Sequence, residues 1–297
     1  MYSKHKIMEN IKAKMTIRNI AFDFSEIKEN LYVRNNSFST HFTNSLHVLF
    51  PIGEKFFIKS VKRYMNFIED PKLKKEMIDF MGQEGVHYRE HERFWEQLLV
   101  LGIDAKPFAN FVEKSIKYLE KFFYFFLTEK YADKLSLSIT TGMEHYTALF
   151  GNQSLGNRAY KQDFFSKEME MLMLWHSAEE LEHKAVAFDV LQKVDQSYFL
   201  RVIGFVLAST FFYTLGFGGM FYFIWKDKKR NLKKPFTQFK EFLINFGTKP
   251  QDAAGWQLLL DYFKRDFHPD QHENYHLAED FFRENKEYFE AHSYLVS

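Results

Sequence analysis

Residues 175–189, WHSAEELEHKAVAFD, gather two histidines and three glutamates within eight consecutive positions. His176, Glu180 and His183 stand at offsets of 0, 4 and 7, so a helical period places them on one stripe. A surface helix scatters its charges around its outer side, whereas imidazole and carboxylate groups on one stripe can bind a metal ion. The stripe is therefore either a solvated face or one wall of a metal site.

A second stretch repeats the Glu-x-x-His spacing of this motif. In GQEGVHYREH, Glu84 and His87 stand at i and i+3. Glu54 in FPIGEKFF and Glu144 in TTGMEHYTALF are single carboxylates in apolar or neutral surroundings. Taken alone, Glu54 is a first-turn glutamate that interacts with the helix dipole. Two such pairs and two single glutamates on four helices are the pattern with which ferritin-like bundles hold two metal ions.

The ligand types limit the choice of metal. The chain contains no cysteine, so histidine and carboxylate must supply every ligand. Such ligands suit iron or manganese, and zinc remains an alternative. Four carboxylates also offset two dications that would be costly to bury without partners. We expect two iron ions, with manganese or zinc as alternatives, at a catalytic centre of Glu54, Glu84, His87, Glu144, Glu180 and His183.

Neighbouring ionisable residues are interpreted differently. His176 is either the seventh ligand or a histidine packed behind the ligands. His91 lies one helical turn beyond His87 and competes for the same role; we expect it behind the ligands or facing the substrate. His145 and Glu179 each stand one position from a proposed ligand, so they point about 100° away from it. We do not expect these two residues to bind metal.

Long helices must position these ligands, and the spacing predicts them almost everywhere. Proline precedes several helical stretches, which suits a first helical turn. Helices are predicted at 51–69, 71–101, 108–132, 134–152, 161–193, 235–247, 252–266 and 277–292. Residues 21–27 are a candidate extended stretch, and Asn35–Ser39 reads as a loop. The helical connection 102–133 matches the long crossover of ferritin-like bundles. The predicted fold is all-α: a ferritin-like four-helix bundle with a helical crossover and additional C-terminal helices.

An uncharged stretch of 24 residues follows the predicted bundle, between Arg201 and Lys226. Its length is sufficient for a membrane-spanning helix, but Gly216, Gly218 and Gly219 interrupt it. It is either an apolar hairpin or a single long helix. The stretch 202–225 then meets lipid, helped by the basic residues of 226–234, or it is buried against the bundle or a second subunit.

The predicted elements divide the chain into four regions. They are an N-terminal segment 1–50, the dimetal bundle 51–195, the apolar and membrane-associated segment 196–230, and a C-terminal helical extension 231–297. No apolar signal-peptide region follows the lysines near the N-terminus, so we expect a cytoplasmic protein, peripheral or integral on the inner face of the membrane. A homodimer is an alternative use of the apolar segment.

Composition excludes several function classes. The chain has 297 residues, of which 46% are hydrophobic and 19% aromatic, which is ample for a sizeable core. Forty basic and 39 acidic residues leave a net charge of +1, so nucleic acid is not an expected partner. Neither a Rossmann glycine fingerprint nor a P-loop appears, which argues against a built-in nucleotide cofactor.

The motifs resemble a known family. The stretches FPIGEKFF, QEGVHYREH, MEHYTALF, WHSAEELEHKAVAFDV and YFKRDFHPD are similar to bacterial predicted metal-dependent hydrolases, from about Ile17 to Asp270. This resemblance implies a ferritin-like helical domain with a dinuclear centre on the glutamates and histidines named above. The HxxxExxH stripe is also similar to the last ligand helix of di-iron N-oxygenases of aryl amines, which implies His176 as a seventh ligand.

Three functions follow from these expectations. We favour an oxidative di-iron enzyme that activates dioxygen, takes electrons from an external donor and attacks a small apolar or amine-bearing substrate. The first alternative is a hydrolase whose nucleophile is a metal-activated water. The second is a non-catalytic iron-binding protein, which the long apolar segment makes less suitable as a soluble storage cage.

Overall fold

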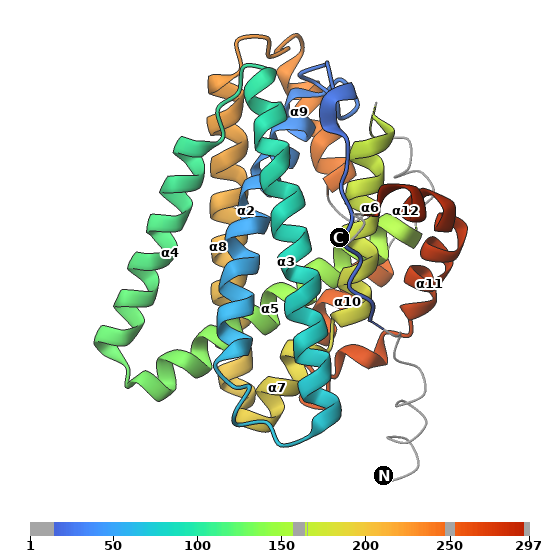
Figure 1. Ribbon diagram of the computed structural model, residues 1–297. Helices are drawn as coiled ribbons and strands as arrows, with labels where there is room; N and C mark the ends of the chain where they lie inside the picture. The colour runs from blue at the N-terminus through green and yellow to red at the C-terminus, as the bar shows by residue number, and fades with distance from the viewer. Residues whose placement is uncertain (1–14, 157–163, 165, 247–252, 294–297) are drawn as a thin grey trace.

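The computed structural model describes residues 15–156, 164, 166–246 and 253–293. Within these ranges the chain forms helices joined by short turns, with isolated β-bridges and no β-strand (Figure 1). The all-α prediction is confirmed, and the arrangement is compatible with a ferritin-like bundle. The candidate extended stretch at 21–27 instead contains a 3-10 helix, η1 (Phe24–Glu26). The first residues of the helix predicted at 161–193 lie outside the described residues.

Four long helices carry the proposed ligands, and a fifth connects them. The ligand helices are α2 (Ser37–Lys62), α3 (Pro71–Val100), α5 (Glu129–Gly156) and α6 (Lys167–His183). The helical crossover predicted between the second and third of them is α4 (Lys106–Phe126), which stands apart at the left of Figure 1. An ion pair joins the C-terminal half of α4 to α2, where Lys59 Nζ lies 2.7 Å from Glu120 Oε1.

The first ligand helix starts earlier than predicted. It begins at Ser37, because the Asn36 side chain accepts hydrogen bonds from the backbone N–H groups of Phe38 and Ser39 and caps the helix. The predicted loop at Asn35–Ser39 is therefore largely a helix start. Pro51 lies inside the helix rather than in its first turn, and α2 crosses the predicted division at residues 50 and 51.

The helix predicted at 161–193 is broken after the last ligand. Helix α6 ends at His183, and α7 (Val186–Val194) begins after a two-residue turn. Lys184 in this turn is buried, and its ammonium donates to the backbone carbonyl of His272 and to the Asn274 side chain. These hydrogen bonds stabilise the Lys184 ammonium group, which would be costly to bury without partners.

The apolar stretch forms one unbroken helix, α8 (Tyr198–Lys226), which resolves the hairpin alternative. Its glycines permit close packing instead of a bend. A Cβ atom at Gly204 would lie 2.0 Å from Ser138 Oγ, and one at Gly219 would lie 2.1 Å from Ser45 Oγ. Among the described helices, α8 is long and apolar enough to cross a membrane by length and composition, and 33% of its apolar window is buried.

The C-terminal region is helical, as predicted. Its elements are α9 (Pro235–Phe246), α10 (Ala253–Asp261), η3 (Pro269–Gln271), α11 (Tyr275–Glu284) and α12 (Lys286–His292). The helix predicted at 277–292 is divided at Asn285. Helix α11 packs against α6 and α5, so the extension covers one side of the ligand helices.

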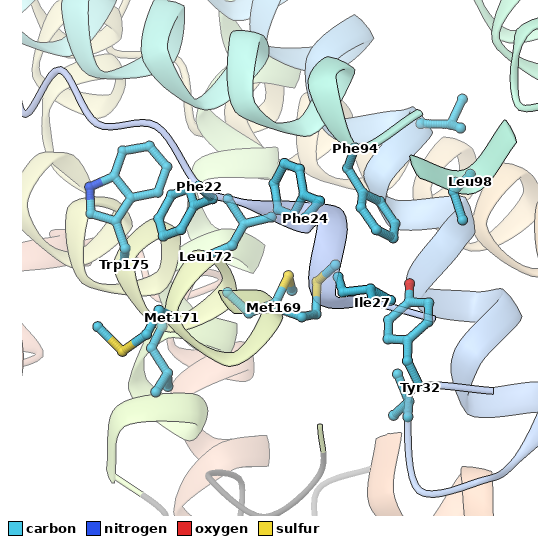
Figure 2. Packing of buried hydrophobic residues seen from close by; sticks show 14 of the residues in the cluster. Phe22, Phe24, Ile27, Tyr32, Phe94, Leu98, Met169, Met171, Leu172 and Trp175 are labelled. Atoms are coloured by element: carbon cyan, nitrogen blue, oxygen red, sulfur yellow. The ribbon is translucent and has the colours of Figure 1, made fainter. Parts of the chain in front are cut away.

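Residues 20–27, which precede α2, pack on the outside of α3 and α6. Figure 2 shows Phe22 and Phe24 between Trp175 and Phe94, and the ring centroids of Phe22 and Trp175 are 5.5 Å apart. Buried aromatic pairs of this kind add to the stability that apolar burial provides. This packing places Arg18, four residues before Phe22, beside Glu179 and Glu182 of α6.

Candidate metal centre

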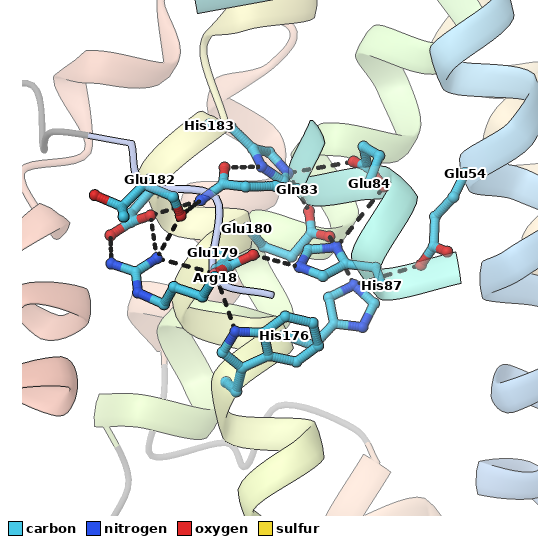
Figure 3. A network of polar contacts seen from close by, with 12 residues as sticks. Arg18, Glu54, Gln83, Glu84, His87, His176, Glu179, Glu180, Glu182 and His183 are labelled. Atoms are coloured by element: carbon cyan, nitrogen blue, oxygen red, sulfur yellow. Dashed lines mark hydrogen bonds and ion pairs between the residues drawn. The ribbon is translucent and has the colours of Figure 1, made fainter. Parts of the chain in front are cut away.

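All seven proposed ligands meet in the interior of the ligand helices. Figure 3 shows most of them converging between α2, α3 and α6. Each has less than a tenth of its surface exposed, and together they are Glu54, Glu84, His87, Glu144, His176, Glu180 and His183. The fold therefore brings together residues that are up to 129 positions apart in the chain, from Glu54 to His183.

The ligand atoms fall into overlapping groups. In one group, atoms of Glu84, Glu144, Glu180 and His183 all lie within 4.8 Å of one another, and in a second group Glu54, Glu84 and His87 do so. A third group joins His87 and Glu180 to His176. Because Glu84 and Glu180 each belong to two groups, the residues suit two adjacent metal positions with shared carboxylates.

The carboxylates of Glu54, Glu84 and Glu144 provide the clearest test of whether this cluster fits metal ions. Both oxygens of each are buried, and none makes a hydrogen bond within the described residues. Burial, together with repulsion from neighbouring glutamates, raises the pKa of Glu54 and Glu144 well above the usual range. Buried polar groups without partners are rare and costly. Metal cations would satisfy them, so the residues present fit the two ions.

Hydrogen bonds turn the two Glu-x-x-His histidines toward this cluster. His183 Nδ1 lies 3.0 Å from Gln83 Oε1, which leaves Nε2 facing Glu180 at 3.2 Å. His87 Nε2 lies 3.0 Å from Glu179 Oε2, which leaves Nδ1 directed to the carboxylates. Each ring donates one N–H outward and presents its other nitrogen inward, the arrangement that metal-binding histidines use.

Arg18 connects the partners of both histidines. Its guanidinium donates to Glu179 at 2.9 Å and to Glu182 at 2.8 and 2.7 Å. The Gln83 amide N–H in turn donates to Glu182 at 2.7 Å. The spacing of the motifs does not predict this role for Arg18, Gln83 or Glu182. One signal for a cationic partner was available in the sequence. Helix α6 carries two further glutamates, Glu179 and Glu182, beside the proposed ligands.

His176 belongs to a chain of buried histidines. Its Nε2 lies 2.7 Å from Glu180 Oε1, and its Nδ1 lies 2.6 Å from Nε2 of His91. Nδ1 of His91 then lies 2.7 Å from Nδ1 of His47. Burial, with nearby histidines, lowers the pKa of His176 to about 4 and that of His47 to about 3. The lowered pKa values favour uncharged rings, which can donate from one nitrogen and accept at the other along these contacts.

His91 has two possible roles in this arrangement. Its contact with His176 is what a residue behind the ligands would make. Atoms of Glu54, His91 and His176 also lie within 4.8 Å of one another, which is close enough for a shared ion. The expectation that His91 lies behind the ligands or faces the substrate stays a prediction. His47, which completes the chain, was not singled out from the sequence because it precedes every recognised motif.

The residues excluded as ligands point elsewhere. The His145 ring lies 4.8 Å from the Tyr262 ring in an aromatic cluster under α10, measured between centroids. Glu179 contacts His87 and Arg18 on the outer side of the cluster. Near the C-terminus, His268 Nε2 lies 2.8 Å from Asp189 Oδ1, away from the proposed ligands.

A pocket lies against the histidine side of the cluster. His176, Ser177 and Glu180 line its inner end. About half of the other lining residues are apolar, among them Phe42, Leu46, Phe50, Phe150, Met173 and Phe242, and the rest are polar, among them Arg34, Gln153 and Asn245. Pockets with apolar walls and a few polar groups are typical of sites for small organic ligands.

Comparison with known proteins agrees with the geometry of this cluster. The family model described as predicted metal-dependent hydrolase matches residues 16–273, a range that includes every proposed ligand. No curated protein and no solved structure gives a significant match. The match covers far more than half of the chain. The chain therefore belongs to the family of predicted metal-dependent hydrolases, and its buried histidine and glutamate groups could bind metal.

Proposed function

We propose that this protein is a di-iron enzyme that activates dioxygen to oxidise a small apolar or amine-bearing substrate. The observation that carries the proposal is the junction of two features: a cluster of four glutamates and three histidines, and an apolar pocket that reaches His176 and Glu180. Iron ions held by these residues would supply the redox chemistry with dioxygen, and an external donor would have to supply the electrons.

The residues of the chain contribute binding, orientation and exclusion of water. The aromatic walls of the pocket, including Phe50 and Phe150, would hold an apolar substrate beside the cluster. Phe50 also packs against the His176 ring, with centroids 4.9 Å apart. Removing water strengthens the electrostatic interactions of the buried carboxylates. The polar groups of Ser177 and Glu180 at the inner end would orient an amine.

A hydrolase is the second candidate function. The description of the family favours it, and two adjacent metal positions suit a metal-activated water as nucleophile. Such an enzyme needs the same ligands but no external electron donor. The two candidates therefore differ in how the loaded protein responds to oxygen, and not in whether it binds metal.

The oxygen response separates the two candidates. The purified protein is analysed for bound metal, reduced without air and then mixed with oxygen while its visible spectrum is recorded. We expect bound iron and a transient absorption band that depends on prior reduction. Bound zinc with a spectrum indifferent to oxygen, together with hydrolysis of model esters, would support the hydrolase. Glu84→Ala is the control, because it should lose both the metal and the band.

A further inference from the structure

The outer face of α8 is an exposed stripe without charge. Its exposed side chains recur at helical spacing and are Phe199, Ile203, Val206, Tyr213, Phe221 and Trp225. The only charged residue before Lys226 in this helix is Arg201, which is buried. At 1.5 Å per residue, a helix of this length extends for about 40 Å. A surface this long and apolar is unusual in a soluble monomer.

Helix α4, beside α8, adds a second set of exposed aromatic side chains. They are Phe111, Tyr118, Phe122, Phe125 and Phe126, and Phe125 is 80% exposed. Both helices lie on the left of the bundle in Figure 1. They are in contact where the Phe108 ring stacks on Tyr222, with centroids 5.4 Å apart. We call the exposed aromatic and apolar side chains of these two helices together the α4–α8 face.

Cations border this face. The segment after α8 exposes Lys226, Lys228, Lys229, Arg230, Lys233 and Lys234. The single acidic residue among them, Asp227, is buried and paired with His41 and Asn30, so it does not neutralise the cluster at the surface. Trp225 and Phe236, which are 67% and 91% exposed, flank the cluster. Aromatic side chains beside lysine and arginine are typical of surfaces that meet anionic lipid.

Two other occupants fit the face less well. A two-fold dimer places the same patch of each copy in one interface, which would bring like cations together. A membrane-spanning α8 would have to leave α2 and α5, against which Gly219 and Gly204 pack without space for a Cβ atom. A bilayer that covers only the exposed stripe does not bring like cations together, and it leaves α8 packed against α2 and α5.

We propose that the α4–α8 face docks side-on to a bilayer that carries anionic lipids. The aromatic side chains enter the boundary between headgroups and acyl chains, and the cations of 226–234 bind the headgroups. Lysines at positions 114, 117 and 121 of α4 add to this attraction. The bundle remains in water, with its ligand cluster behind the docked face.

A groove between these helices could accept a hydrocarbon chain from the same bilayer. It is lined by apolar residues of α2, α4, α5 and α8, among them Gly53, Met143 and Phe212. Gly53 and Met143 each precede a proposed ligand in the sequence. Docking would therefore place lipid hydrocarbon next to the helices that carry Glu54 and Glu144.

Vesicle flotation of the full chain tests the proposal and requires no activity. The protein is mixed with vesicles of phosphatidylcholine alone, or of phosphatidylcholine with phosphatidylglycerol. We expect the protein to float with the anionic vesicles and to be released from them by high salt. It should not float with vesicles of phosphatidylcholine alone. The charge variant Lys228→Glu/Lys229→Glu/Arg230→Glu should partition at least about a hundredfold less.

A second variant tests the aromatic contribution. Phe122→Ser/Phe125→Ser should reduce partition while its helical circular dichroism stays unchanged, because both side chains are exposed. The matched controls are Phe67→Ser, another exposed aromatic side chain, and Lys72→Glu/Lys75→Glu/Lys286→Glu, which should float like the natural chain. The proposal is overturned if the natural chain floats with neither vesicle. It is also overturned if light scattering shows a dimer that only the Phe122→Ser/Phe125→Ser change disperses.

Discussion

Arg18 Nη1 lies 2.9 Å from Oε1 of Glu179, and this contact joins the N-terminal segment to the helix that carries the last three ligands. The same guanidinium holds Glu182. Glu179 accepts from the outer nitrogen of His87, and Glu182 acts on His183 through Gln83. One arginine outside the bundle therefore orients both Glu-x-x-His histidines (Figure 3).

Arg18→Ala should weaken metal binding by about 10- to 100-fold, the usual effect of losing a group that orients a ligand. The physical reason is that Glu179 and Glu182 lose their shared cation and no longer fix the two imidazoles. A competition titration against a metal-binding dye measures the change. Arg93→Ala is the matched control, since Arg93 also pairs with a buried glutamate, Glu90, but contacts no proposed ligand. Equal affinities in both variants would refute the positioning role of Arg18.

Glu144→Gln should stabilise the metal-free protein while abolishing stabilisation by metal. Burial and the neighbouring glutamates raise the pKa of Glu144 in the folded state above 4.5. Ionisation therefore costs folding free energy, and this cost grows as the pH rises from about 4.5 through the raised pKa. Thermal unfolding at neutral pH, with a chelator and with added iron, measures both effects. A natural chain whose Tm does not respond to metal would contradict the assignment.

His145→Gln should make the protein less sensitive to acid. Burial, with repulsion from His272, lowers the pKa of His145 to about 3, so the folded state keeps this ring neutral. Below pH 6.5 the His145 ring becomes protonated in the unfolded chain, whereas in the folded chain it stays neutral until the pH approaches 3. The natural chain should lose up to about 1.4 kcal/mol of stability per pH unit from this residue as the pH falls toward 3. Urea unfolding at pH 6.5 and pH 5 should show a smaller loss for the variant.

Gly204→Ala should destabilise the fold by about 1–3 kcal/mol, because the new methyl group would overlap Ser138 on α5. Gly218→Ala is the matched control in the same helix. A Cβ atom there meets nothing within 4 Å, so the gain in helix propensity should stabilise α8 by about 0.5–1 kcal/mol. Urea unfolding of both variants gives the comparison. Equal effects would show that α8 does not pack closely on α5.

His176→Ala should retain both metals but change the rate at which the reduced protein reacts with oxygen. The remaining ligands still include four carboxylates, whereas the histidine beside the pocket is lost. Stopped-flow absorbance after anaerobic reduction measures the rate, and elemental analysis confirms the metal content. Unchanged kinetics would assign His176 to packing alone.

The sequence was most informative where function follows helical periodicity. The spacing of Glu180 and His183 is local, so it predicts a shared face without knowledge of the fold. Arg18 could not be found in this way, because its contact with Glu179 spans 161 positions and depends on how the N-terminal segment packs. His47 was missed for the same reason: its role depends on contact with His91 on another helix.

Several helix boundaries differ from the predicted ones, for identifiable reasons. Pro51 suggested a helix start, but the cap formed by Asn36 and the packing around α2 outweigh the loss of one backbone hydrogen bond. The glycines of α8 suggested a bend, yet Gly204 and Gly219 serve close contact between helices. In both cases the deciding interactions are with neighbouring helices, which a single stretch of sequence does not reveal.

The central claim is that the seven buried residues bind two adjacent metal ions. Elemental analysis of the iron-loaded chain, alongside Glu84→Ala, tests it most directly, because Glu84 belongs to two of the ligand groups. We predict two metal ions per natural chain and the loss of most of both from the variant. A natural chain that binds no metal, or a Glu84→Ala chain that keeps two ions, would contradict the claim.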